Sequence, residues 1–216
     1  MNLKRKLLQE SRLYVIIDKE ALKRARPLIN AAGNIMGAGA DVIQYRDKIS
    51  DKETVLGNAL LLRKILKNSK TLFIVNDYLD IAKITDSDGI HLGQDDLPIE
   101  LARRILGKDK IIGISCHNLK EAVSARNKGA DYISMGPVFA TLTKPNLKPL
   151  GLGLINEAAK IIRIPFFAIG GINKSNISEV LTFGAKRVAV CRAVCQAKDI
   201  SSLTKRFINL LGYRKV

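Results

Sequence analysis

Short runs of apolar and β-branched residues recur along the chain at fairly even intervals. Most of them are continuously apolar and do not alternate with polar residues, which is typical of strands buried on both faces. Amphipathic segments separate the runs. The pattern predicts eight strands, at residues 13–18, 41–45, 72–76, 89–92, 111–115, 132–136, 166–170 and 187–191.

The segments between these strands have the marks of helices. Asn118 and Asn176 stand where helix N-caps are expected, and Gly129 and Gly184 stand where those helices would end. Eight strands that alternate with helices favour a closed (β/α)8 barrel over a doubly wound sheet, because no strand is left to form an edge. We therefore expect an α/β protein, a single (β/α)8 TIM-barrel domain over residues 1–216 with a short N-terminal helix.

Composition narrows the class of protein. The chain of 216 residues is 47% apolar, but no stretch reaches the roughly 18 apolar residues that a spanning helix needs, and the N-terminus does not read as a signal peptide. We expect a soluble, cytoplasmic protein with no membrane partner. Cys116, Cys191 and Cys195 are too few and too irregularly spaced for a disulfide framework or a metal site, which predicts reduced thiols.

Charge points to an anionic partner. Lys and Arg number 36 against 20 Asp and Glu, a formal net charge of +16. The basic residues are scattered and aromatic residues make up only 5% of the chain, which favours a solvated basic surface over a nucleic-acid face. We expect phosphorylated small molecules as ligands and no nucleic acid. The sequence is compatible with a homodimer but does not fix the oligomeric state.

The predicted strand ends carry a distinctive set of polar groups. In a (β/α)8 barrel the chemistry lies at the C-terminal ends of the strands. Six of the eight ends carry cations, carboxylates, hydroxyls or glycines suited to one purpose, the binding of phosphate esters. The residues at or just after the second to eighth predicted strands are Gln44, Arg46 and Lys48; Asn76 and Asp77; Gln94, Asp95 and Asp96; Ser115 and His117; the segment GPVFATLTKPN; Gly170 and Gly171; and Cys191 and Arg192.

Each type of group suits a magnesium-dependent phosphate site. Arg and Lys neutralise phosphate oxygens, and glycines let backbone N–H groups approach them. Asp77 and Asp96 end neighbouring strands and would together suit Mg²⁺, which takes one or two protein carboxylates plus substrate phosphates. Some of these residues also have a purely structural interpretation. Asp77 could be a turn residue, the QYRDK motif could form a surface ion pair, and His117 could cap a helix.

The order and spacing of several motifs resemble thiamine-phosphate synthases. The motifs are QYRDK, VNDYLDIA, DGIHLGQDDLP, IGISCHNLKEA, GADYISMGPVFATLTK, FFAIGGI and VAVCRAV, and the resemblance runs from about residue 13 to about residue 195. It implies a barrel transferase that joins 4-amino-2-methyl-5-(diphosphooxymethyl)pyrimidine to a thiazole phosphate, giving thiamine phosphate and pyrophosphate. It also implies that the bond to pyrophosphate breaks before the thiazole nitrogen attacks.

The resemblance also implies roles for individual residues. The pyrimidine diphosphate would be held by the QYRDK motif and three further side chains, and one Mg²⁺ ion by two aspartates. The diphosphate set is Gln44, Tyr45, Arg46, Asp47, Lys48, Asn76, Ser115 and Lys144, of which Arg46, Lys48, Ser115 and Lys144 would be catalytic; the metal pair is Asp77 and Asp96; the thiazole phosphate set is Thr141, Leu142, Thr143, Gly171, Cys191 and Arg192.

Two positions depart from the family pattern. Leu142 stands where the family commonly has a lysine, and Arg192 stands where it usually has a small residue. A guanidinium at Arg192 would either grip the thiazole phosphate or obstruct the pocket. Two alternatives stay open: a thiazole tautomerase, for which His117 would transfer protons, and a non-catalytic basic barrel that binds RNA. The polar TLTKPN segment is a candidate lid.

Overall fold

The computed structural model describes residues 2–22, 27–145 and 147–212. Its strands hydrogen-bond in chain order, all of them parallel, and the last strand pairs with the first, so that the sheet closes into a barrel. The predicted (β/α)8 barrel is confirmed. The strands are β1 (Leu13–Asp18), β2 (Val42–Arg46), β3 (Leu72–Asn76), β4 (Gly89–Leu92), β5 (Ile111–Cys116), β6 (Tyr132–Met135), β7 (Phe166–Ile169) and β8 (Val188–Val190).

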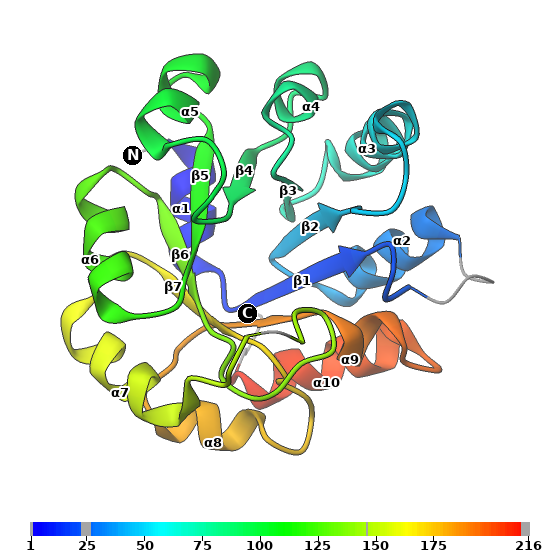
Figure 1. The fold of residues 1–216 in the computed structure, drawn as a ribbon. Coiled ribbons are helices and arrows are strands. Elements are labelled where there is room, and N and C mark those ends of the chain that lie inside the picture. The colour runs from blue at the N-terminus through cyan, green and yellow to red at the C-terminus, as the bar shows by residue number, and fades with distance from the viewer. Residues whose placement is uncertain (1, 23–26, 146, 213–216) are drawn as a thin grey trace.

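Helices surround the barrel as a ring (Figure 1). Two helices, one of them short, follow the last strand, and α10 packs beside α2. The ring consists of α2 (Leu28–Ala38), α3 (Lys52–Leu66), α4 (Leu79–Ile84), α5 (Ile99–Leu106), α6 (Leu119–Asn127), α7 (Gly151–Ile161), α8 (Ile177–Thr182), α9 (Arg192–Cys195) and α10 (Ile200–Leu210).

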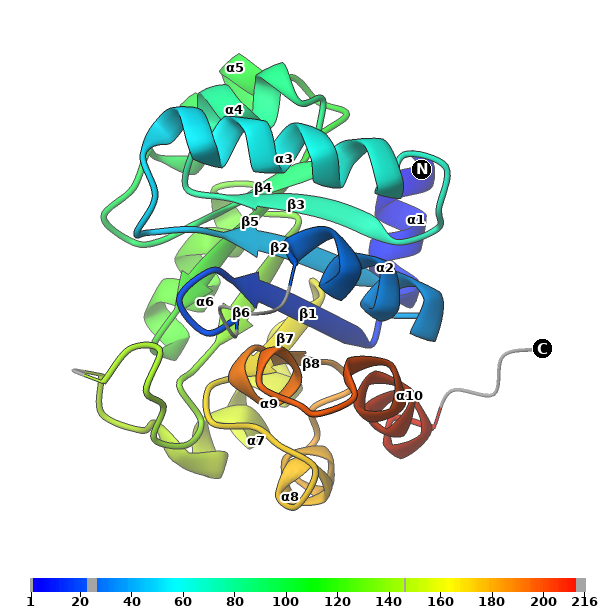
Figure 2. The same cartoon turned by 90° about the vertical axis from the view of Figure 1, so that its right-hand side faces the viewer.

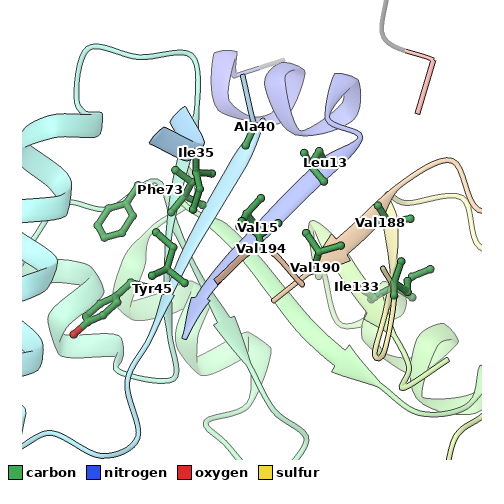
Figure 3. Packing of buried hydrophobic residues seen from close by; sticks show 14 of the residues in the cluster. Leu13, Val15, Ile35, Ala40, Tyr45, Phe73, Ile133, Val188, Val190 and Val194 are labelled. Carbon is green, nitrogen blue, oxygen red and sulfur yellow. The ribbon is translucent and has the colours of Figure 1, made fainter. Parts of the chain in front are cut away.

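Side chains alternate between two hydrophobic clusters because successive residues of a strand point to opposite faces. One set fills the inside of the barrel, including Tyr14, Tyr132 and Phe167. The other set packs between the strands and the helices. Figure 3 shows part of this outer cluster, including Val15, Tyr45 and Phe73. Both faces are thus buried, which is why the strands read as continuous apolar runs.

Helix α1 (Leu3–Glu10) lies at the end of the barrel where the strands begin (Figure 2). Leu8 is 1% exposed and joins the inner cluster. Two ion pairs fasten the helix: Lys4 Nζ lies 3.2 Å from a carboxylate oxygen of Asp88, and Arg5 Nε lies 2.7 Å from one of Asp131. The predicted N-terminal helix is therefore present, and it closes the end of the barrel opposite the predicted site.

Local signals for the helix ends are only partly as predicted. Asn118 caps α6 by accepting a hydrogen bond from the Glu121 backbone N–H at 2.8 Å, and Gly129 ends that helix with φ 87°. Asn176 precedes α8, but its side chain makes no capping hydrogen bond to the helix. Across the described residues, no helix has both the length and the apolar character needed to cross a membrane. All three cysteines are free thiols, as predicted.

Candidate functional site

A cavity of about 490 Å³ opens at the C-terminal ends of the strands. It is the place where the strand-end residues from β2, β3, β5 and β8 converge with the segment that follows β6. Most of the predicted site residues line it. They are Gln44, Arg46, Asn76, Ser115, Thr141, Leu142, Thr143, Lys144, Gly171, Cys191 and Arg192.

The two predicted metal-binding carboxylates lie together beside this cavity. Asp77 follows Asn76, which lines the cavity, and forms an ion pair with Lys48. Partial burial raises the pKa of Asp77, and the neighbouring carboxylate of Asp96 raises it further, while Lys48 acts in the opposite direction. Asp96 is held in place because its carboxylate accepts the Gly93 backbone N–H at 2.6 Å. The ends of β3 and β4 thus bring two acidic groups together.

Cations surround this acidic pair. Arg46 is paired with Asp18, a carboxylate that is 1% exposed. Partial desolvation lowers the pKa of Lys144, the charge of nearby Arg46 lowers it further, and Asp77 and Asp96 oppose the shift. A lowered lysine pKa among other cations indicates a site that is electrostatically ready for an anion.

Tyr45 and Asp47, which were predicted to help hold the pyrimidine diphosphate, do not line the cavity. Gln44 and Arg46 face inward, so the residues that alternate with them face outward. Tyr45 packs in the outer cluster, where Figure 3 shows it with Phe73. Its hydroxyl donates to Asp47 at 2.8 Å, and Asp47 accepts two backbone N–H groups of the turn that carries Lys48. Their side chains brace this turn.

Glycines let two loops meet at the far side of the cavity. Gly170 and Gly171 have φ values of 101° and 65°, which favour glycine. A Cβ atom at Gly171 would lie 2.6 Å from the carbonyl oxygen of Ala140, so the segment after β6 packs directly on this backbone. The Asn176 side chain donates to the Gly171 carbonyl at 3.0 Å and accepts the Asn173 N–H at 2.8 Å. It braces the glycine turn, which explains why it does not cap α8.

Arg192 and Leu142 line the cavity in different ways. The Arg192 Nε atom is buried and has no hydrogen-bond partner within the described part of the chain. Such a group is costly unless a ligand satisfies it, because a buried charged donor without a partner loses its hydration. The Leu142 side chain is 75% exposed on the loop above the cavity. Arg192 therefore indicates a binding site for an anion, whereas Leu142 contributes an apolar side chain.

His117 does not cap the following helix, contrary to the structural reading of the sequence. Asn118 has that role. His117 lines the cavity, and its Nδ1 atom lies 3.2 Å from a carboxylate oxygen of Glu121, which also accepts the His117 backbone N–H at 2.7 Å. The helix start thus holds the imidazole at the cavity wall.

Sequence reasoning missed two groups of the site. Asp18 holds Arg46, and its position as the last residue of β1 follows the same strand-end rule that singled out Asp77. His91 lies within β4 and lines the cavity floor. A histidine inside a short apolar run gave no comparable signal.

The structure is a (β/α)8 barrel whose cavity lies at the C-terminal ends of the strands, where barrel enzymes carry their active sites. A family model described as thiamine monophosphate synthase matches residues 13–194. A thiamine-phosphate synthase of Chloroflexus aurantiacus is 43% identical over 205 residues, with 93% of each chain covered. The chain therefore belongs to the thiamine-phosphate synthase family, a family of transferases, as the motifs predicted.

A solved structure agrees with this assignment. The thiamine phosphate pyrophosphorylase of Pyrococcus furiosus has a TM-score of 0.85 at 36% identity, with 98% of each chain covered. Some relatives are longer: the chain is 38% identical to a thiamine-phosphate synthase of Prochlorococcus marinus, of which it spans 59%.

Proposed function

We propose that the protein condenses 4-amino-2-methyl-5-(diphosphooxymethyl)pyrimidine with a thiazole phosphate, releasing pyrophosphate and forming thiamine phosphate. The observation that carries this proposal is the meeting of three cations, Arg46, Lys48 and Lys144, with the carboxylate pair of Asp77 and Asp96 beside one cavity. Cations stabilise a departing diphosphate, and the acidic pair suits a metal ion that does the same.

The proposed reaction does not require a strong catalytic base from the protein. If the carbon–oxygen bond to pyrophosphate breaks first, the step needs the leaving group's charge to be neutralised and water to be excluded, not a strong base. Arg46 is fixed by the buried Asp18, so its charge is held in place before the substrate arrives. Lys144 lines the cavity from the loop after β6, and this loop would cover the reacting atoms.

Asp77 and Asp96 would hold Mg²⁺ together with oxygens of the bound diphosphate. Among the described residues, no group of three or more His, Cys, Asp or Glu side chains is placed to hold a metal ion. Two carboxylates fit Mg²⁺ nonetheless, because this ion usually keeps several waters and takes substrate phosphates as ligands. When bound, Mg²⁺ would withdraw charge from the leaving pyrophosphate. Lys48, paired with Asp77, would also contact that group.

The thiazole phosphate would bind at the far side of the cavity. Gly171, Cys191 and Arg192 meet there with Thr141 and Thr143 of the loop after β6. We propose that Arg192 grips this phosphate and does not obstruct the pocket, since its buried Nε atom lacks a partner among the described residues. An arginine fork suits phosphate oxygens.

The direct test mixes the purified protein with both substrates and Mg²⁺ and looks for thiamine phosphate by mass spectrometry. The proposal predicts equal amounts of thiamine phosphate and pyrophosphate. Substrates that remain unjoined under conditions where both bind the protein would contradict it.

One observation favours a second candidate, a thiazole tautomerase. His117 lies at the cavity wall with its imidazole beside the Glu121 carboxylate, an arrangement suited to proton transfer. Incubation with the thiazole phosphate alone separates the two functions. Isomerisation of the thiazole ring without the pyrimidine substrate would support the tautomerase, whereas the synthase needs both substrates.

We also propose that the protein works in the cytoplasm on small phosphorylated molecules. Free thiols at all three cysteines support a reducing compartment. The cavity's strand-end cations support small anionic ligands.

A further inference from the structure

A chain of hydrogen bonds crosses the inside of the barrel beneath the cavity. Gln44 Nε2 donates to the Tyr14 hydroxyl at 2.7 Å, and the Tyr14 hydroxyl lies 2.9 Å from that of Tyr132. The Tyr132 hydroxyl lies 2.9 Å from His91 Nδ1, and His91 Nε2 lies 3.0 Å from Ser115 Oγ. Four strands besides that of Gln44 contribute to this chain, and the residues at both of its ends, Gln44 and Ser115, line the cavity.

The chain is built into the core. Tyr14, Gln44 and Tyr132 are each at most 2% exposed, and His91 is 7% exposed. Gly113 leaves room for the Tyr132 ring, since a Cβ atom there would lie 2.0 Å from that ring. Burial of these polar groups is tolerated because each one has a partner.

The protonation states are fixed by this environment. Burial raises the pKa of Tyr14 and of Tyr132, so both hydroxyls keep their protons. Burial lowers the pKa of His91 to about 3, and the positive charge of Lys144 adds to the effect. A neutral imidazole has one N–H donor and one acceptor nitrogen. Each hydrogen bond in the chain therefore has one group that donates and one that accepts.

The direction follows from Gln44. If its amide nitrogen donates to Tyr14, Tyr14 donates to Tyr132 and Tyr132 donates to His91 Nδ1. The His91 proton is then on Nε2 and is donated to Ser115 Oγ, which the Ser134 hydroxyl also approaches as a donor at 3.5 Å. Gln44 then has its amide oxygen left for a ligand, and Ser115 has its own proton left for one.

We propose that Tyr14, Tyr132 and His91 form a positioning relay that makes the cavity floor present an acceptor at Gln44 and a donor at Ser115. This pattern recognises a flat heteroaromatic ring that carries an amino group and, elsewhere on its edge, an unprotonated ring nitrogen. The inference rests on the proposed function, because an aminopyrimidine has both groups. His91 is a positioning residue that acts through Ser115.

Tyr14→Phe cuts the relay next to Gln44 and keeps the ring that packs against Phe167. We expect nitrogen NMR of the ligand-free wild type to show His91 protonated on Nε2 alone, and Tyr14→Phe to give a mixture of tautomers. We also expect this variant to bind the pyrimidine diphosphate about tenfold more weakly, the effect of one lost hydrogen bond, and to bind inorganic pyrophosphate unchanged. Tyr132→Phe cuts the next link and should act in the same way.

Thr204→Val is the matched control, because it removes a buried hydroxyl of α10 that bonds within its own helix, at 2.7 Å to the Ile200 carbonyl. It should change neither the tautomer nor the ring affinity. The relay is refuted by a wild-type His91 protonated on Nδ1. It is also refuted if Tyr14→Phe leaves the tautomer or the affinity for the pyrimidine diphosphate unchanged. A protein that binds this ligand with the predicted tautomer but makes no thiamine phosphate would contradict the proposed function and not the relay.

Discussion

At the scale of single residues, the environment of Lys144 indicates most directly which kind of ligand the site binds. Lys144 lies at the cavity with its pKa lowered by partial desolvation and by Arg46, so an arriving anion would favour its charged form. We predict that Lys144→Ala lowers kcat/KM for the pyrimidine diphosphate by about 10²-fold, the usual loss for one electrostatic stabiliser. Steady-state kinetics at fixed Mg²⁺ measure this.

Lys148 provides the control for this variant. It is exposed on the same loop but does not line the cavity. Lys148→Ala should retain wild-type kinetics. An equal loss of kcat/KM in both variants would mean that activity depends on the total charge of the loop and not on the cation at Lys144.

A variant of Arg192 tests the proposed thiazole phosphate site at the opposite side of the cavity. Its buried Nε atom has no protein partner within the described residues, so the thiazole phosphate would satisfy it. We predict that Arg192→Ser raises KM for the thiazole phosphate at least tenfold, since hydrogen bonds to charged groups are worth more than neutral ones, and leaves KM for the pyrimidine diphosphate unchanged. Faster turnover in this variant would show that the guanidinium obstructs the pocket.

At the scale of elements, the loop after β6 depends on the glycine turn after β7. Gly171 has φ 65°, and a Cβ atom there would approach both the Ala140 carbonyl oxygen and Phe139 Cβ, the latter at 2.7 Å. We predict that Gly171→Ala displaces this loop and weakens thiazole phosphate binding at least tenfold in a protein that still folds, because the strain is local. Isothermal titration with the thiazole phosphate measures the loss.

Gly33→Ala is the matched control for this variant. Gly33 lies within α2, and nothing lies within 4 Å of a Cβ atom built there. Alanine should stabilise the helix by roughly 0.5–1 kcal/mol and leave binding unchanged. Normal thiazole phosphate affinity in Gly171→Ala would remove the proposed link between turn and loop.

Helix α1 closes the barrel end far from the site, and its contribution is to stability. Leu8→Ala removes a buried side chain of the inner cluster and should lower the free energy of unfolding by about 3 kcal/mol. Leu3→Ala, on the same helix, removes a side chain that is 70% exposed and should have little effect. Urea unfolding of both variants measures the difference, and equal stabilities would show that α1 does not seal the core.

At the scale of the whole molecule, the barrel was predictable because its signals are local and repeated. Each strand is a continuous apolar run, and no predicted strand boundary differs from the observed one by more than one residue. The convergence of strand-end residues followed from the fold, since parallel strands of a barrel end at one rim. Asp77 and Asp96, 19 positions apart in the sequence, are neighbours for this reason.

Features that depend on side-chain direction or on distant partners were not predictable. The contact by which the Tyr45 hydroxyl donates to Asp47 has no signal in the sequence, and β2 extends to Arg46, one residue beyond the predicted end. The residues around Asn176 predict a helix cap, but its side chain donates a hydrogen bond to the turn at Gly171. The relay through His91 joins five strands, and no stretch of sequence contains it.

The most direct test of the central claim, that Asp77 and Asp96 hold the metal ion that assists the departure of pyrophosphate, is a Mg²⁺ titration of thiamine phosphate formation. It compares the wild type with the double variant Asp77→Asn and Asp96→Asn, whose amides keep the shape of the side chains but lose their charge. We predict that turnover by the wild type rises with Mg²⁺ to saturation, and that the double variant shows no saturable response. The same Mg²⁺ dependence in both proteins would contradict the claim.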